Sequence, residues 1–121
     1  AVVFLPGGMP GTLRLKENAQ VRAEVLRRAE ASLKLAAICA APSILAELGV
    51  LEGRRATANP GFMDALSAGG AQVQSECVVV DGNIVTSRGA GTALELGLEL
   101  VRLLLGEEAA QQVRESIVWQ H

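Results

Sequence analysis

Residues 35–42 read LAAICAAP, and this stretch decides how the chain is expected to fold. Residues 35–38 form a short apolar run that is typical of a buried strand, and Pro42 suits the first turn of a helix that stops at Gly49. Cys39 therefore lies where a strand turns directly into a helix, with an alanine two positions before it and another two positions after it. This is the pattern of a nucleophile elbow, in which larger flanking side chains would collide across a sharp turn and the nucleophile adopts a strained backbone conformation.

Cys39 is the candidate nucleophile of the chain. The unpaired N–H groups at the start of a helix stabilise a thiolate, and the thiolate is the form of cysteine that attacks electrophiles. A second interpretation exists, because free cysteine is among the residue types most often buried in a core. The motif alone supports both interpretations about equally. Cys77, which opens the apolar run Cys-Val-Val-Val, has neither a helix start nor a basic neighbour, so we expect it to serve packing.

Upstream of the elbow, the sequence predicts one more strand and one helix. Residues 1–5 (AVVFL) form a continuous apolar run, which predicts a parallel strand that is buried on both faces. A Pro-Gly-Gly turn follows at residues 6–8, and residues 18–32 carry apolar side chains at helical spacing. Because a buried parallel strand needs a neighbour on each side, we expect a segment before Ala1, or a second polypeptide, to complete the sheet.

Downstream of the elbow, strands and helices continue to alternate. In order, we expect a strand at residues 55–58, a helix at 61–68, two strands within 77–87, a Leu-rich helix that ends at residue 106 and a last helix at 107–115. The turn Asp-Gly-Asn at residues 81–83 indicates a hairpin, and Thr92 with Glu95 forms the T-x-x-E pattern of a capping box. This order predicts an α/β layered fold with a mainly parallel sheet, in one domain that covers residues 1–121.

The composition excludes several classes of protein. The 121 residues carry a net charge of −2, so no excess of positive charge is available to hold a nucleic acid. No apolar run reaches the ~18 to 20 residues that span a membrane, and the N-terminus lacks the pattern of a signal peptide. Two cysteines cannot form a disulfide framework, which favours the cytoplasm. Neither a phosphate-binding loop nor a cluster of metal ligands is evident, so we expect no cofactor and no metal.

Three motifs taken together resemble the DJ-1/ThiJ/PfpI superfamily. They are LPGG at residues 5–8, AAICAAP at 36–42 and TSRGAGT at 86–92, and their order and approximate spacing agree over nearly the whole chain. The resemblance implies a three-layer α/β/α sandwich of the flavodoxin-like type that is incomplete at its N-terminus. It also implies that the protein forms a homodimer.

The resemblance assigns roles to residues at two turns. Cys39 would be the elbow cysteine, and the backbone N–H groups of Gly8 and Ala40 would form an oxyanion or anion-binding pocket. Glycine at positions 7 and 8 is suitable there, because a residue without Cβ lets the backbone come close to a substrate oxygen. Gly7 is therefore a secondary candidate for the site.

Asn59 and Arg88 are the other secondary candidates. Asn59 stands where many members of the superfamily have a histidine, and asparagine cannot act as a general base. The sole histidine is His121 at the end of the chain, so a Cys-His protease or amidase mechanism within this chain is disfavoured. Arg88 could bind an anion or a partner subunit, and a structural ion pair is an equal alternative. Trp119 is expected to seal a core or a dimer edge.

The superfamily also places a glutamate next to the elbow cysteine, in an early helix that precedes the Pro-Gly-Gly strand. A protonated glutamate on the sulfur would hold the thiolate and could shuttle protons in glyoxalase-type chemistry. We interpret Glu17 and Glu24 as solvated surface charges rather than as substitutes. An upstream segment of the same protein is therefore expected to supply the glutamate.

Two classes of function follow from the resemblance. The first is a cofactor-free, cysteine-dependent enzyme with glyoxalase or deglycase chemistry on small reactive carbonyls, such as methylglyoxal, or on glycated adducts. The second is a redox sensor or chaperone that responds to oxidation of Cys39 and requires no turnover. The amidase or peptidase activity of other branches of the superfamily stays open. Nothing in the residues supports the thiazole monophosphate step for which some members are named.

Overall fold

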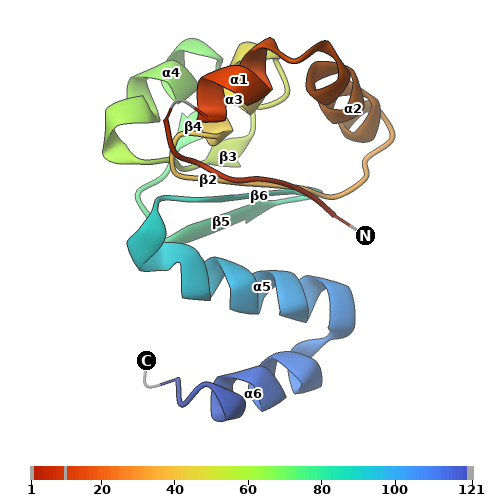
Figure 1. Ribbon diagram of the computed structural model, residues 1–121, viewed down its shortest axis with the longest axis vertical. Helices are drawn as coiled ribbons and strands as arrows, with labels where there is room; N and C mark the ends of the chain where they lie inside the picture. Colours follow the sequence, from red (N-terminus) through yellow and green to blue (C-terminus); the bar gives the residue numbers. More distant parts are fainter. Residues whose placement is uncertain (1, 10, 120–121) are drawn as a thin grey trace.

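A four-stranded sheet lies between two groups of helices in the computed structural model, which describes residues 2–9 and 11–119 (Figure 1). The strands of this sheet, in spatial order, are β1 (Val3–Leu5), β2 (Leu35–Ile38), β6 (Ile84–Ser87) and β5 (Val78–Asp81). The parallel pair β3 (Arg55–Ala56) and β4 (Gln72–Val73) forms a second, small sheet. The helices are α1 (Gly11–Glu17), α2 (Ala19–Glu30), α3 (Pro42–Glu47), α4 (Met63–Ala68), α5 (Ala93–Leu105) and α6 (Glu107–Ser116), with 3₁₀ turns η1 (Pro60–Phe62) and η2 (Ala90–Thr92).

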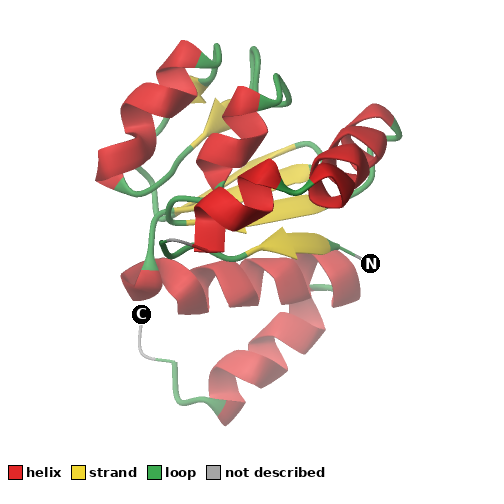
Figure 2. Ribbon diagram, turned by 45° about the horizontal axis from the view of Figure 1, so that its top comes forward, coloured by secondary structure: helices red, strands yellow, loops and turns green. Residues whose placement is uncertain are grey.

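The helices form the outer two layers of the molecule. Helices α1 to α4 cover one face of the sheet, whereas α5 covers the other face and α6 packs against α5 (Figures 1 and 2). Strands β1, β2 and β6 run parallel, and among the described strands the β5–β6 hairpin supplies the antiparallel pair. The prediction of a flavodoxin-like three-layer α/β/α fold with a mainly parallel sheet is confirmed.

Strand β2 is buried on both faces, and its side chains divide between two cores. Leu35 and Ala37 point toward α1–α4, whereas Ala36 and Ile38 point toward α5, as the two-residue repeat of a strand requires. Because neither face meets water, every position of the strand is apolar. This burial explains why the run LAAI shows no alternation of polar and apolar residues.

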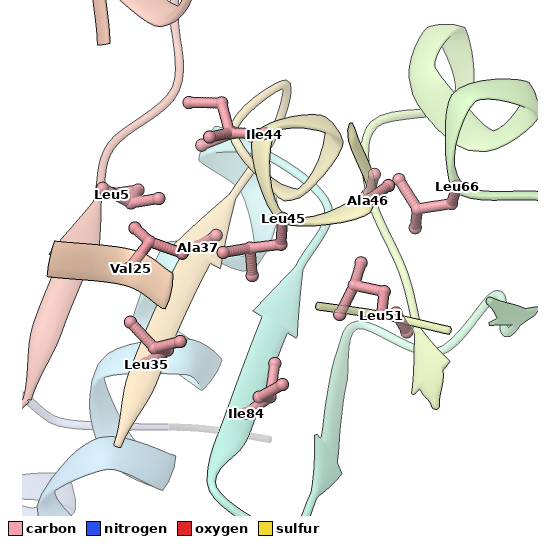
Figure 3. Packing of buried hydrophobic residues seen from close by; sticks show 13 residues of the cluster. Leu5, Val25, Leu35, Ala37, Ile44, Leu45, Ala46, Leu51, Leu66 and Ile84 are labelled. Atoms are coloured by element: carbon pink, nitrogen blue, oxygen red, sulfur yellow. The ribbon is translucent and has the colours of Figure 1, made fainter. Parts of the chain in front are cut away.

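We call the two cores the larger core and the smaller core. The larger core lies between the sheet and α1–α4, and Figure 3 shows side chains from β1, β2, β6 and the helices meeting there. Its largest fully buried side chains include Val25 of α2, Ile44 and Leu45 of α3, and Leu66 of α4. The smaller core lies on the α5 face and contains Ala36, Ile38, Val85 and Leu96.

Strand β1 forms one edge of the sheet and pairs with β2 alone among the described residues. Leu5 is 4% exposed in the larger core, but Phe4 on the opposite face is 43% exposed. The expectation that this strand is buried on both faces is therefore wrong for residues 3–5 in this chain, while Ala1 lies outside the described residues. An apolar edge strand leaves free backbone N–H and C=O groups that can pair with a further strand.

Several local predictions need correction. The helix predicted at residues 18–32 is preceded by a second helix, α1, and the break falls at Asn18, whose Oδ1 accepts the N–H groups of Gln20 and Val21 at 2.9 and 3.0 Å. Thr92 does not cap α5 in the expected box with Glu95; its hydroxyl bonds the preceding turn instead. Strand β4 was not predicted, because a pair of residues is too short to show a periodic pattern.

The helices of this chain are too short or too polar to cross a membrane in the part that the structure describes. Within residues 2–9 and 11–119, none of them combines the length and the apolar composition that a membrane span needs.

Candidate active site

Cys39 follows β2 immediately and has the left-handed backbone conformation, with φ at +64°. This conformation is unfavourable for a residue with a Cβ, and a strained nucleophile is what the elbow pattern predicted. The peptide groups around Cys39 are held from two sides. Its N–H donates to the carbonyl of Ser87 at 3.1 Å, and its carbonyl accepts the N–H of Asn59 at 2.9 Å.

The Pro-Gly-Gly turn lies directly against the elbow. A Cβ placed on Gly7 would lie 2.6 Å from Cys39 Cβ and 2.8 Å from the carbonyl oxygen of Ile38, so no side chain fits at this position. Gly8 is needed for a different reason, because its φ of +95° is disfavoured for other residues. The side of Gly8 where a Cβ would stand is open space, with no atom within 4 Å. Gly7 therefore places the turn against Cys39, and Gly8 leaves room for a bound molecule.

Two backbone donors near Cys39 are unused in the described part of the chain. The N–H groups of Gly8 and Ala40 donate to no described residue, whereas those of Ala41, Ser43 and the residues after them are taken up by the turn and by α3. Helix α3 has 6 residues and begins at Pro42, three positions after Cys39. The free N–H groups are the more direct source of stabilisation for a negative charge.

A pocket of about 600 Å³ opens beside Cys39. Its walls come from β1, the Pro-Gly-Gly turn, the end of β2 and the first turns of α5, and they are almost entirely apolar: Phe4, Pro6, Gly7, Gly8, Ile38, Cys39, Ala90, Ala93, Leu96, Gly97 and Leu100. Among the described residues that line it, Cys39 is the one whose side chain can ionise. The pocket can admit a small molecule to the sulfur, but it supplies no second group for proton transfer.

No carboxylate of residues 2–9 and 11–119 is hydrogen-bonded to the Cys39 sulfur. Glu17 is exposed on α1. Glu24 forms an ion pair with Arg27 at 2.7 Å, and this hydrogen bond lowers the pKa of its carboxyl group below the ordinary value of 4.5. Both glutamates are therefore surface charges, as the sequence indicated.

Asn59 lies beside the elbow through its backbone. Its N–H holds the Cys39 carbonyl, while its side-chain Oδ1 accepts the N–H of Gly61 at 3.0 Å and caps η1. The side chain therefore has a local structural role, and it offers no base to the sulfur.

Arg88 connects two loops by donating to their backbone carbonyl groups. Its Nε donates to the carbonyl of Ala58 at 3.2 Å and its Nη1 to the carbonyl of Ser75 at 3.3 Å. Within the described ranges no carboxylate pairs with its guanidinium. The ion-pair alternative therefore finds no carboxylate partner among the described residues.

Cys77 is exposed at the start of β5, so the expectation that it serves packing is wrong. Trp119 lies half-buried just after α6, and His121 falls outside the described residues. The described residues also contain no group of three or more His, Cys, Asp or Glu side chains that could hold a metal ion.

Ser87 and Thr92 were missed as individual residues, although both belong to the TSRGAGT motif. Ser87 is fully buried at the end of β6, and its Oγ lies 2.7 Å from the Thr92 Oγ1 and donates to the carbonyl of Cys77 at 2.6 Å. The available signal was the pair of hydroxyl residues that flank Arg88 and two glycines. What these hydroxyl groups contact depends on which strand ends lie together in the fold, and the spacing of the residues along the sequence does not show this.

Known proteins match this chain over most of its length, beyond the three motifs found in the sequence. A sequence model of the DJ-1/PfpI family matches residues 1–103 of this chain. The Parkinson disease protein 7 homolog of Danio rerio is 43% identical over 119 residues, which are 97% of this chain and 62% of that protein. The glutathione-independent glyoxalase DJR-1.2 of Caenorhabditis elegans is 31% identical, over 96% of this chain and 61% of that protein. A deglycase of Pyrococcus abyssi is 41% identical over 84% of this chain and 61% of its own length.

A solved structure agrees with the fold. The crystal structure of Drosophila melanogaster DJ-1beta superposes with a TM-score of 0.93 at 36% sequence identity, covering 99% of this chain and 64% of that chain. This chain therefore spans less than two thirds of the length of these relatives.

Proposed function

This chain belongs to the DJ-1/PfpI family, and from that premise we propose that Cys39 is the nucleophile of a glyoxalase- or deglycase-type reaction on small reactive carbonyl compounds. The observation that carries the proposal is the strained, left-handed backbone of Cys39 beside a pocket with unused N–H donors. Two relatives support the substrate class, since one is named a glyoxalase and another a deglycase.

The first step is addition of the sulfur to an aldehyde. The Cys39 thiolate forms a C–S bond to the aldehyde carbon of methylglyoxal, and the electrons of the C=O bond move to its oxygen. The N–H groups of Gly8 and Ala40 are suited to hold this oxyanion, which then takes a proton to give a hemithioacetal. Transfer of a proton from the first carbon to the second, together with transfer of the hydroxyl proton from the oxygen on the first carbon to the oxygen on the second, gives a lactoyl thioester. Hydrolysis of the thioester releases lactate and the free thiol.

The proton transfer requires a group that residues 2–9 and 11–119 do not supply. We propose that a glutamate on a further segment of the same protein carries it, on the side of the pocket formed by Phe4 and α5. The free edge of β1 and the second pocket of about 390 Å³ between β1 and α2 offer a place for that segment. Hydrogen exchange in the complete protein tests this: slow exchange at β1 is expected, and fast exchange would contradict it.

Lactate formation from methylglyoxal is the direct test of the activity. The purified complete protein should produce lactate, Cys39→Ala should abolish it, and Cys77→Ala should leave it unchanged. Unchanged lactate formation in Cys39→Ala would overturn the assignment of the nucleophile.

Labelling with iodoacetamide tests the reactivity of the sulfur independently of substrate. We expect Cys39 to be alkylated faster than Cys77 at pH 6 to 7, although Cys77 is the more exposed of the two. Equal labelling, or preference for Cys77, would contradict the proposal that the elbow makes Cys39 reactive. Mass spectrometry of the two labelled peptides provides the comparison.

A redox-responsive role is the second candidate, and the open space at Gly8 favours it. The same N–H groups that would hold an oxyanion could hold the sulfinate that peroxide forms on Cys39. Oxidation to the sulfinate without any lactate formation would support this role. An amidase or peptidase mechanism gains no support, because the Asn59 amide caps η1. A homodimer stays a prediction, to be tested by light scattering of the complete protein.

A further inference from the structure

Two peptide groups hold Cys39, and each of them is itself held at its other end. The Cys39 N–H meets the carbonyl of the peptide between Ser87 and Arg88, and the Cys39 carbonyl meets the N–H of the peptide between Ala58 and Asn59. A peptide group is planar, with its C=O and N–H pointing in opposite directions, so fixing one end sets the direction of the other. The groups bound to the opposite ends therefore control how Cys39 is held.

The hydroxyl of Thr92 holds the first of these peptides. Thr92 Oγ1 accepts the N–H of Arg88 at 3.2 Å and that of Gly89 at 3.1 Å, and it lies 2.7 Å from Ser87 Oγ. The Ser87 hydroxyl donates to the carbonyl of Cys77, and the Thr92 hydroxyl can donate either to Ser87 Oγ or to the carbonyl of Gly89, which lies 3.0 Å away. Linked hydrogen bonds of this kind, here partly buried, strengthen one another. They fix the Ser87 carbonyl that receives the Cys39 N–H.

The guanidinium of Arg88 holds the second peptide. Its Nε donates to the carbonyl of Ala58, which belongs to the same peptide group as the N–H of Asn59. A charged donor on that carbonyl polarises the group and strengthens the bond that its N–H makes to Cys39. The second donor of Arg88, to Ser75, keeps the side chain in this orientation.

We infer that Thr92 and Arg88 are positioning residues for Cys39, each orienting one of the two peptide groups that hold the left-handed elbow. The inference rests on the proposed function, in which Cys39 is the reacting group. It gives Arg88 a role toward backbone carbonyls in place of the anion-binding role considered from sequence. It also explains why hydroxyl and guanidinium groups lie together in one short motif after β6.

The test compares matched variants of the complete protein. Thr92→Val removes the hydroxyl and keeps the shape, whereas Thr92→Ser restores the hydroxyl. The readout is the alkylation rate of Cys39 at pH 6.5 divided by its rate at pH 9, measured by mass spectrometry of the Cys39 peptide. We expect Thr92→Val to lower this ratio about fivefold, as loss of one net hydrogen bond implies, and Thr92→Ser to stay close to the unchanged protein.

Arg88→Gln is the parallel test of the second peptide, and it carries the test if Thr92→Val does not fold by circular dichroism. Its ratio should fall about tenfold, because a charged donor is lost. Asn18→Ala is the control, since it removes the N-cap of α2 and weakens the fold without contacting the elbow. Its ratio should not change.

The outcomes distinguish failure of the positioning role from failure of the proposed function. If Cys39 of the unchanged protein reacts no faster at pH 6.5 than cysteine in the denatured chain, the proposed function fails. If that protein reacts fast and folded Thr92→Val and Arg88→Gln match Asn18→Ala, the positioning role is overturned while the proposed function stands. A fall confined to the two site variants, with recovery in Thr92→Ser, supports the positioning role.

Discussion

The two faces of the central sheet differ in how much apolar material covers them. Among the described residues, the larger core, under α1–α4, contains 13 buried residues, whereas the smaller core, under α5, contains 4. The pocket beside Cys39 opens on the thinly covered face, where residues of β1 and α5 line it. The α1–α4 face therefore supplies most of the buried apolar residues, whereas the α5 face leaves space at the sulfur of Cys39.

The elbow lies at the boundary between these two faces. Ala37 and Ala41, on either side of it, are buried in the larger core, whereas Ile38 and Cys39 line the pocket on the other face. Strained backbone persists only when its surroundings determine it strongly. Packing on the α1–α4 face therefore helps to hold the strained backbone of Cys39, whereas the pocket beside Cys39 lies on the α5 face.

The largest expected effect contrasts one leucine from each face. Leu45→Ala, at a fully buried position of α3, should lower the free energy of unfolding by about 2 to 5 kcal/mol, because it leaves a cavity in the larger core. Leu100→Ala, at the partly exposed pocket wall, should lower it by less than about 1 kcal/mol. Urea denaturation measures both. Equal losses of unfolding free energy would show that the two faces contribute alike to stability, which would contradict the difference described here.

Gly7→Ala should have the next largest effect. The new Cβ would lie 2.6 Å from Cys39 Cβ, so either the turn or the elbow must move. We expect a loss of about 1 to 3 kcal/mol in unfolding free energy, as overpacking implies, together with slower alkylation of Cys39. Gly11→Ala, at a glycine with open space around it, is the matched control and should be nearly neutral. Unchanged alkylation of Cys39 in Gly7→Ala would show that the position of the Pro-Gly-Gly turn does not affect the elbow.

Val118 has strained backbone outside the elbow. Its φ is +58°, it is 69% exposed, and it lies two residues after the end of α6, where the N–H of the next residue bonds back to the carbonyl of Arg114 at 2.8 Å. Val118→Gly should therefore raise the midpoint of thermal unfolding, with a net stabilisation of about 0.5 to 1 kcal/mol. Alkylation of Cys39 should be unaffected. A destabilised Val118→Gly protein would show that the left-handed residue is not a source of strain.

The smallest effect concerns the surface of α2, on the outer side of the larger core. The hydrogen bond from Arg27 lowers the pKa of Glu24, so folding is favoured by the ionised carboxylate. This contribution is present above the ordinary pKa of 4.5 and is lost as the pH falls through the lower value of the folded protein. Glu24→Gln should thus be slightly less stable at pH 7, and the difference should vanish in acid. Glu17→Gln, at an exposed carboxylate on α1, is the control in urea titrations at both pH values.

Much of the fold could be predicted because its signals are local. The apolar run before Cys39, the small residues around it and Pro42 fall within a few positions, and they predict a strand, an elbow and a helix start. The hairpin at residues 81–83 is equally local. In contrast, α1 and β4 are short elements without a strong periodic pattern, and the exposure of Cys77 depends on how the β5 end meets its surroundings.

The sequence by itself determined that this chain is an α/β protein with a cysteine at a strand-to-helix turn, because apolar periodicity, turn residues and small flanking side chains act over short distances. Only the tertiary structure decided which groups hold that cysteine. Ser87 and Asn59 reach Cys39 from 48 and 20 positions away in the chain, and the contact of Gly7 spans 32 positions. Such contacts depend on the order and register of the strands, which bring the ends of β1, β2 and β6 to one edge of the sheet.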